Sequence, residues 1–187
     1  DILYICSPNN PTGAVFSKNK LQEWVDFANQ NGSVILFDAA YEAFIEDDGL
    51  PHSIFELKGA GTCAIEICSL SKTAGFTGTR LGYTIIPEDL TRKGMNLNRM
   101  WVRNRTTKTN GISYILQKGG AAVFTSEGQA QIRENIGYYK ENARILTDVF
   151  DKLGIWYCGG RNAPYVWIKC PGEMGGWEFF DLLLKYN

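Results

Sequence analysis

The chain has 187 residues, 44% of them hydrophobic, and its 19 basic and 20 acidic side chains leave a formal net charge of -1. This composition is that of a globular protein that can bury a core, and it argues against a nucleic-acid-binding or membrane-spanning protein. Five cysteines without a C-x-x-C pair favour a reduced, cytoplasmic setting. A single histidine gives little support to a His-based metal cluster or a Ser-His-Asp triad.

The first predicted strand is Ile2–Cys6, an apolar run that ends in the polar loop Ser7-Pro8-Asn9-Asn10-Pro11-Thr12-Gly13. Prolines and a glycine restrict the path of this loop, and the side-chain amide of Asn10 can donate a hydrogen bond to a ligand. An ordinary strand-to-helix turn is the alternative interpretation. Ser17 then predicts the N-cap of an amphipathic helix that ends at Gly32.

Residues 34–37 form a second continuous apolar run, of the kind that is buried on both faces of a parallel sheet. Asp38 follows directly, at the end of the strand where open α/β sheets bind ligands. A carboxylate there can pair with a protonated pyridine nitrogen, and Tyr41 can hydrogen-bond a phenolic oxygen of the same ring. The simpler alternative is that Asp38 caps a helix that begins at Ala39.

The third strand is predicted at residues 64–68 and leads into Ser69-Leu70-Ser71-Lys72, with Arg80 eight residues after the lysine. Lys72 stands among hydroxyls and glycines, which suits an amine that forms a Schiff base. The two serine hydroxyls and the guanidinium can hold a phosphate beside it. Together these features indicate pyridoxal 5'-phosphate (PLP) as cofactor, whereas a lysine taken alone is more often a solvated surface charge.

Three predicted strands thus deliver cofactor-suited groups at one edge of the sheet. Asn10-Pro11-Thr12-Gly13, Asp38-Ala39-Ala40-Tyr41 and Ser69-Leu70-Ser71-Lys72 resemble the PLP-dependent class I/II aminotransferases of fold type I. Within that family, residues 38–45, 73–83 and 106–111 most resemble the LL-diaminopimelate aminotransferases. The resemblance implies an α/β fold, with three αβα layers and a mostly parallel sheet in a large domain, followed by the start of an α+β small domain.

The resemblance also implies roles for individual residues. Lys72 would form the Schiff base and transfer a proton, Asp38 would pair with the pyridinium, and Tyr41 would complete the catalytic set. The cofactor-binding residues would be Asn10, Asp38, Tyr41, Ser69, Ser71, Lys72, Arg80 and Asn110, of which Asn10 and Asn110 would also contact substrate. Asn110 would approach the cofactor phosphate of a neighbouring subunit, which implies a homodimer. Without the resemblance, Asn110-Gly111 is a turn signal.

The remaining elements extend this organisation. Residues 81–86 predict a fourth strand, and the capping-box pattern at residues 126–129 begins one long helix that ends at Gly154. A strand at residues 165–168 and a helix around residues 177–184 follow. We expect residues 1–130 to be part of the large PLP-binding domain, residues 131–154 to be a connecting helix, and residues 155–187 to begin the small domain.

The sequence is expected to be a fragment, because it begins inside a strand and ends inside the small domain. The family's glycine-rich turn, ring-stacking aromatic residue and carboxylate-binding arginine would lie outside it, so the isolated chain is expected to show little or no turnover. The leading function is transamination of LL-diaminopimelate with 2-oxoglutarate, which gives tetrahydrodipicolinate and glutamate in lysine biosynthesis. The alternatives are an aspartate or aromatic aminotransferase and a non-catalytic fold-type-I remnant that binds or dimerises.

Overall fold

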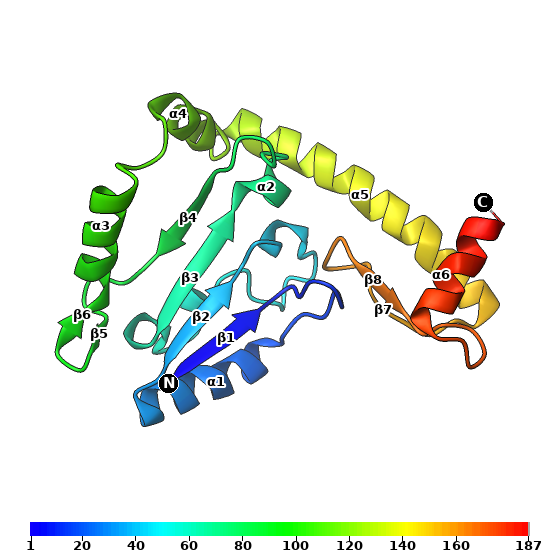
Figure 1. Cartoon of the computed structure of the whole chain (residues 1–187), viewed down its shortest axis with the longest axis horizontal. Helices are drawn as coiled ribbons and strands as arrows, with labels where there is room; N and C mark the ends of the chain where they lie inside the picture. The colour runs from blue at the N-terminus through cyan, green and yellow to red at the C-terminus, as the bar shows by residue number, and fades with distance from the viewer. Residues whose placement is uncertain (187) are drawn as a thin grey trace.

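A four-stranded sheet in the order β1-β2-β3-β4 forms the centre of the structure, a computed structural model that describes residues 1–186 (Figure 1). Two further sheets are hairpins of two strands each. The strands are β1 (Ile2–Cys6), β2 (Val34–Asp38), β3 (Ala64–Ser69), β4 (Gly82–Ile85), β5 (Thr91–Arg92), β6 (Met95–Asn96), β7 (Tyr157–Gly159) and β8 (Val166–Ile168). The helices are α1 (Lys18–Asn31), α2 (Leu70–Thr73), α3 (Leu97–Lys108), α4 (Tyr114–Ala122), α5 (Ser126–Leu153) and α6 (Gly176–Lys185).

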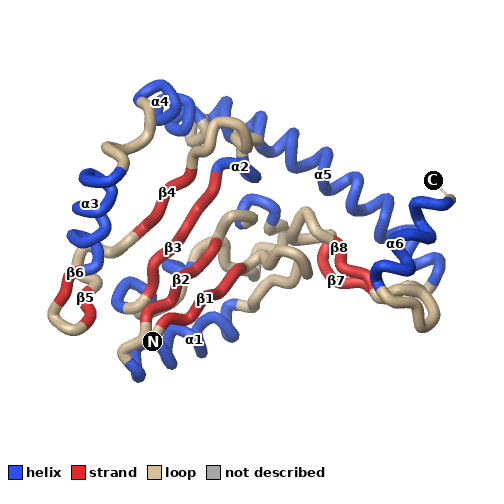
Figure 2. The backbone as a smooth tube through the Cα atoms, viewed as in Figure 1, coloured by secondary structure: helices blue, strands red, loops and turns tan. Residues whose placement is uncertain are grey.

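The first three strands of the central sheet are parallel and end at the same edge. Cys6 of β1 lies opposite Asp38 of β2, which in turn lies opposite Ile67 of β3. Strand β4 runs antiparallel to β3, with Gly82 opposite Ser69. The predicted α/β class with a mostly parallel sheet is confirmed, and the loops that follow β1, β2 and β3 come together at one end of the sheet (Figure 2).

Helix α1 covers one face of this sheet, as the amphipathic pattern predicts. Its buried residues Leu21, Val25 and Ala28 pack in one cluster with Ile35 and Phe37 of β2. The helix begins and ends where the sequence places its caps. The Ser17 side chain accepts a hydrogen bond from the N–H of Lys20, and Gly32 ends the helix in the left-handed conformation.

Helix α5 is the long helix predicted from the sequence, and it crosses the structure as a single rod (Figure 1). Its N-cap is Thr125, so the capping box predicted at Ser126 is wrong by one residue. Thr125 has the extended backbone that a cap requires, and its hydroxyl accepts a hydrogen bond from Gly128. Gln129 instead donates to the carbonyl of Val123.

The hairpin of β7 and β8 lies against loops of the central sheet. The backbones of Gly13 and Gly159 are in close contact, and the side-chain oxygen of Asn162 accepts hydrogen bonds from the N–H groups of Glu46 and Asp47. The strand predicted at residues 165–168 and the helix predicted at residues 177–184 are confirmed as β8 and α6. The division into domains stays a prediction.

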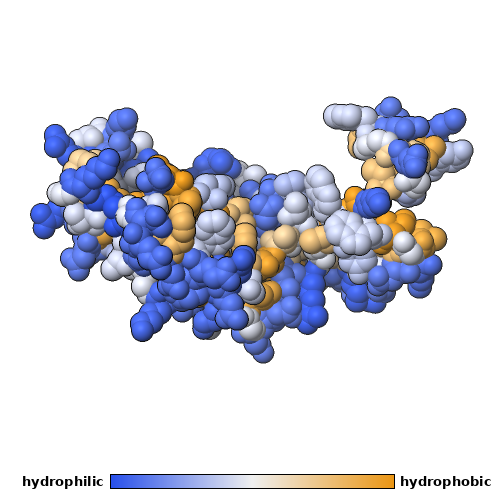
Figure 3. Space-filling view, turned by 90° about the horizontal axis from the view of Figure 1, so that it is seen from below, coloured by the Kyte–Doolittle hydropathy of each residue, from blue (hydrophilic) through white to orange (hydrophobic). Residues whose placement is uncertain are grey.

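The face of the molecule seen in Figure 3 is largely hydrophilic with scattered apolar areas, some of them at the end that carries β7, β8 and α6. Trp156, Trp167 and Trp177 are exposed in this part of the chain. Within residues 1–186, no helix is both long and apolar enough to cross a membrane.

The contact at Gly13 leads to a stability prediction. Gly13 has φ +69°, and an added Cβ would lie 2.6 Å from the carbonyl oxygen of Tyr165. Gly32 has φ +63° but open space around it, so Gly32→Ala is the matched control for backbone strain alone. We expect Gly13→Ala to lower the free energy of unfolding by roughly 2–3 kcal/mol and Gly32→Ala by about 1 kcal/mol.

Denaturant titration of both variants measures this difference. Equal losses would show that the hairpin moves aside without cost and that the close contact at Gly13 contributes nothing to stability.

Candidate active site

Lys72 lies on α2, the single helical turn that follows β3. Ser69 has an extended backbone and its hydroxyl accepts a hydrogen bond from the N–H of Ser71 at 3.3 Å, so it caps this turn. The turn places Lys72 and Ser71 in the wall of a cavity of about 550 Å³. The other residues that line this cavity are Tyr41, Phe44, Thr73, Gly75, Thr77, Asn135, Ile136, Tyr138, Tyr139, Pro164 and Tyr165.

The amine of Lys72 is accessible from this cavity. The side chain is exposed, and its Nζ lies 5.8 Å from the ring centroid of Tyr41. Among residues 1–186, Lys72 takes part in none of the ion pairs. Once it loses its proton, an amine without an ion-pair partner beside an aromatic wall can react with a carbonyl group.

Tyr41 is the centre of a short hydrogen-bond chain. Its side chain is only 6% exposed, and its hydroxyl accepts a hydrogen bond from Nδ2 of Asn10 at 3.4 Å. The hydroxyl of Tyr165 lies 2.5 Å from the same oxygen. Burial raises the pKa of Tyr41, and the contact with Tyr165 raises it further. Tyr41 therefore keeps its proton to a higher pH than an ordinary tyrosine, and its hydroxyl has that proton to donate.

Asp38 lies at the carboxyl end of β2 with both carboxylate oxygens engaged. The hydroxyl of Tyr4 donates to Oδ2 at 2.5 Å, and the N–H of Ala40 donates to Oδ1 at 3.1 Å. The pKa of Tyr4 is raised to about 12, mainly by this hydrogen bond to Asp38 and secondly by burial. The alternative in which Asp38 caps a helix at Ala39 is wrong, because the next helical turn begins only at Glu42.

The predicted phosphate-binding residues lie along the turn from β3 to β4. Ser71 is buried and lines the cavity, whereas Ser69 lies at the start of α2 and lines a neighbouring one. Arg80 is exposed, with φ +60°, and its guanidinium donates to the carbonyl of Thr77 at 2.8 Å. It does not line the Lys72 cavity. Thr77 does line this cavity, so Arg80 is linked to the cavity wall through its hydrogen bond to Thr77.

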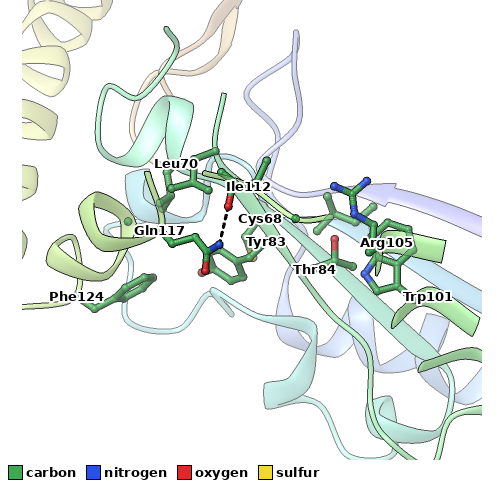
Figure 4. A pocket seen from close by; sticks show the side chains of 14 residues that line it. Cys68, Leu70, Tyr83, Thr84, Trp101, Arg105, Ile112, Gln117 and Phe124 are labelled. Atoms are coloured by element: carbon green, nitrogen blue, oxygen red, sulfur yellow. Dashed lines mark hydrogen bonds between the residues drawn. The ribbon is translucent and has the colours of Figure 1, made fainter. Parts of the chain in front are cut away.

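Asn110 lies apart from this group. It is exposed in the loop between α3 and α4, and its neighbour Gly111 lines a different, mainly apolar cavity of about 850 Å³ (Figure 4). Gln117 closes part of that cavity by donating to the carbonyl of Ile112 at 2.6 Å. None of the eight predicted site residues lines the second cavity. The structure thus brings Asn10, Tyr41, Ser71 and Lys72 together and leaves Asn110 elsewhere.

Tyr165 is the cavity residue that the sequence does not reveal. It lies 124 positions after Tyr41, just before β8, and reads locally as part of an apolar strand. Only the folded chain brings its hydroxyl to Tyr41.

The residues around the Lys72 cavity fit the expected cofactor. The cavity has the size of a small-molecule site and is lined by an amine, hydroxyls and aromatic rings, with an oriented carboxylate nearby at Asp38. Among the described residues 1–186, no cluster of three His, Cys, Asp or Glu side chains could hold a metal ion.

The Tyr4 contact predicts a pH dependence of stability. Unfolded Tyr4 ionises near its ordinary pKa of 10.0, whereas folded Tyr4 keeps its proton to about 12. The folded state therefore binds the proton more tightly, and this contribution to stability is complete below pH 10 and is lost as the pH rises to about 12. We expect the unfolding free energy of the unmodified chain to fall more steeply over this range than that of Tyr4→Phe.

Chemical denaturation at a series of pH values measures the slope. Tyr186→Phe, at a tyrosine that is 80% exposed, is the control and should keep the slope of the unmodified chain. Identical slopes for Tyr4→Phe and the unmodified chain would contradict the assignment.

Comparison with known proteins identifies the family. The sequence profile of "Aminotransferase class I and II" matches residues 1–186. The chain is 56% identical to an LL-diaminopimelate aminotransferase of Lawsonia intracellularis and 52% identical to one of Phocaeicola vulgatus, over 99% and 98% of its length. A solved L,L-diaminopimelate aminotransferase from Chlamydomonas reinhardtii superposes with a TM-score of 0.92 at 45% identity over 99% of the chain.

The chain spans 46% of the length of each of these three relatives. Their family uses PLP, in agreement with the cofactor expected from the residues around Lys72. The match over residues 1–186 shows that the chain belongs to the class I and II aminotransferase family.

Proposed function

We propose that this chain provides the lysine-bearing part of an enzyme that transfers an amino group from LL-diaminopimelate to 2-oxoglutarate. The observation that supports this most directly is that Tyr41 and Lys72 line one cavity at the carboxyl edge of three parallel strands, where Asn10 donates to the Tyr41 hydroxyl. The identity of 51–56% to three LL-diaminopimelate aminotransferases favours this substrate over aspartate or an aromatic amino acid.

Each residue of the cavity has a task in this proposal. PLP, when bound, supplies an electron sink for the negative charge that develops at the substrate α-carbon. The amine of Lys72 would hold the cofactor covalently and would accept the proton from the substrate α-carbon. Its exposed position in the cavity wall and its freedom from ion pairs suit both tasks.

Asp38 would pair with the protonated ring nitrogen and so keep the ring electron-poor. Its carboxylate is oriented for this before the cofactor arrives, because Tyr4 and the N–H of Ala40 each hold one oxygen. A group that is already oriented loses less conformational freedom when it binds.

Tyr41 and Asn10 direct hydrogen bonds to the phenolic oxygen of the ring. Tyr41 is suited to donate because it lines the cavity and its hydroxyl carries a proton at neutral pH. Ser69, Ser71 and Arg80 hold the phosphate. For this task Arg80 exchanges its bond to the Thr77 carbonyl for the phosphate oxygens, which a flexible exposed side chain can do.

The remaining parts of the proposal concern the assembled enzyme. Asn110 is exposed, as a residue must be if it serves the active site of a neighbouring subunit, and we assign it to substrate and cofactor contacts across a homodimer. The product cyclises to tetrahydrodipicolinate, which places the reaction in lysine biosynthesis, in the cytoplasm.

A chimaera tests the substrate and the lysine together. Residues 1–186 of this chain replace the matching segment of the Lawsonia intracellularis relative, so that the rest of the enzyme is supplied by a protein 56% identical in this region. We expect transamination of LL-diaminopimelate with 2-oxoglutarate, and a loss of roughly a thousandfold or more in kcat/KM for Lys72→Ala, because both covalent attachment and proton transfer are lost.

Lys20→Ala is the matched control, because Lys20 is exposed on α1 and paired only with Glu23. It should leave kcat/KM unchanged. A folded chimaera that transaminates aspartate or phenylalanine but not LL-diaminopimelate would contradict the proposed substrate. Full activity of Lys72→Ala would contradict the proposed mechanism.

A further inference from the structure

We infer that Tyr165 is a positioning residue, whose hydroxyl donates to Tyr41 and so directs the proton of Tyr41 towards the ring oxygen of the cofactor. The inference rests on the proposed function, because it assigns the donor that stands behind Tyr41. The two hydroxyl oxygens lie 2.5 Å apart, and both side chains line the cavity that contains Lys72.

The hydrogen-bond inventory of Tyr41 determines the direction of this chain. A phenol has one proton to donate and can accept hydrogen bonds on its oxygen. Asn10 already donates to that oxygen. When Tyr41 gives its single proton to the cofactor oxygen, the short contact with Tyr165 can persist only if Tyr165 is the donor. Tyr165 thus fills the remaining acceptor position of Tyr41 and leaves its proton free for the cavity.

The ring of Tyr165 is held rigidly enough to do this. It packs edge-on against the ring of Tyr41, with the centroids 5.1 Å apart. Its carbonyl accepts a hydrogen bond from Gly160 at 2.7 Å, which closes the hairpin of β7 and β8. The same carbonyl lies so close to Gly13 that no Cβ fits between them. The backbone of Tyr165 is therefore fixed against the loop that carries Asn10.

The turn of the hairpin is also tied to the loop after β2 at a second point. Asn162 accepts from the N–H groups of Glu46 and Asp47 and donates to the carboxylate of Asp47 at 2.9 Å. Arg161 forms an ion pair with the same carboxylate at 2.5 Å. Together with the contact at Gly13, these contacts hold the hairpin against the loops of the central sheet, so the phenol of Tyr165 is presented to Tyr41 in one orientation.

The bond itself can be measured without cofactor. Tyrosine labelled with carbon-13 at the ring carbon that bears the hydroxyl gives one NMR signal for each of the nine tyrosines, and Tyr41→Phe identifies the signal of Tyr41. We expect Tyr165→Phe to shift this signal. Tyr157→Phe is the matched control, because Tyr157 lies on the same hairpin but its hydroxyl donates to Asp151. An unchanged Tyr41 signal in Tyr165→Phe would overturn the inference.

The role of the bond is measured by spectroscopy of the chain loaded with PLP. When the ring oxygen of bound PLP loses a hydrogen-bond donor, it retains its shared proton to a higher pH. The pH at the midpoint of the absorbance change of the bound cofactor should therefore rise. We expect a rise of about one pH unit for Tyr41→Phe and roughly half a unit for Tyr165→Phe, because the latter acts through Tyr41. The double variant should match Tyr41→Phe alone, and Tyr157→Phe should match the unmodified chain.

Two outcomes would overturn the inference and spare the proposed function: an unchanged midpoint in Tyr165→Phe while Tyr41→Phe shifts it, and additive shifts in the double variant. If neither the chain nor its chimaera with the Lawsonia intracellularis relative forms a Schiff base between PLP and Lys72, the proposed function fails, and the role assigned to Tyr165 fails with it. The NMR signals identify this case, because they report the contact between the two tyrosines whether or not cofactor binds.

Discussion

The parallel register of β1, β2 and β3 is the constraint on which the rest of the site depends. Cys6, Asp38 and Ile67 stand in one row across the sheet, so the loops that follow these strands begin side by side. Asn10, Tyr41 and Lys72 lie far apart in the sequence, and this register alone brings them within reach of one another. A slip of one residue in any strand would turn its side chains to the opposite face and separate them.

A second constraint joins the end of the chain to its beginning. The loop that contains Asn10 meets the hairpin of β7 and β8 at two glycines, where the backbones come too close for any side chain. Glycine is needed at Gly13 for both its space and its positive φ. The wall of the Lys72 cavity is formed by residues far apart in the chain, from Tyr41 to Tyr165, and the contact at Gly13 holds the hairpin that contributes Tyr165.

Local patterns in the sequence predict most elements because each depends on neighbouring residues. Apolar runs predict β1, β2 and β3, and the spacing of apolar residues predicts α1 and α5. The N-cap of α5 is shifted by one residue because Thr125 and Ser126 both carry hydroxyls, and only the folded backbone decides between them. The place of Tyr165 and the bond from Arg80 to Thr77 depend on tertiary contacts that no local pattern records.

The central claim is that the chain folds so that Lys72, and no other amine, is presented to a cofactor. Borohydride reduction of the chain loaded with PLP, followed by peptide mass spectrometry, tests it directly because reduction fixes the cofactor to the amine that holds it. The account predicts that the label is found on the peptide that contains Lys72. A label spread over the exposed lysines, such as Lys18 and Lys58, with none on Lys72, would contradict it.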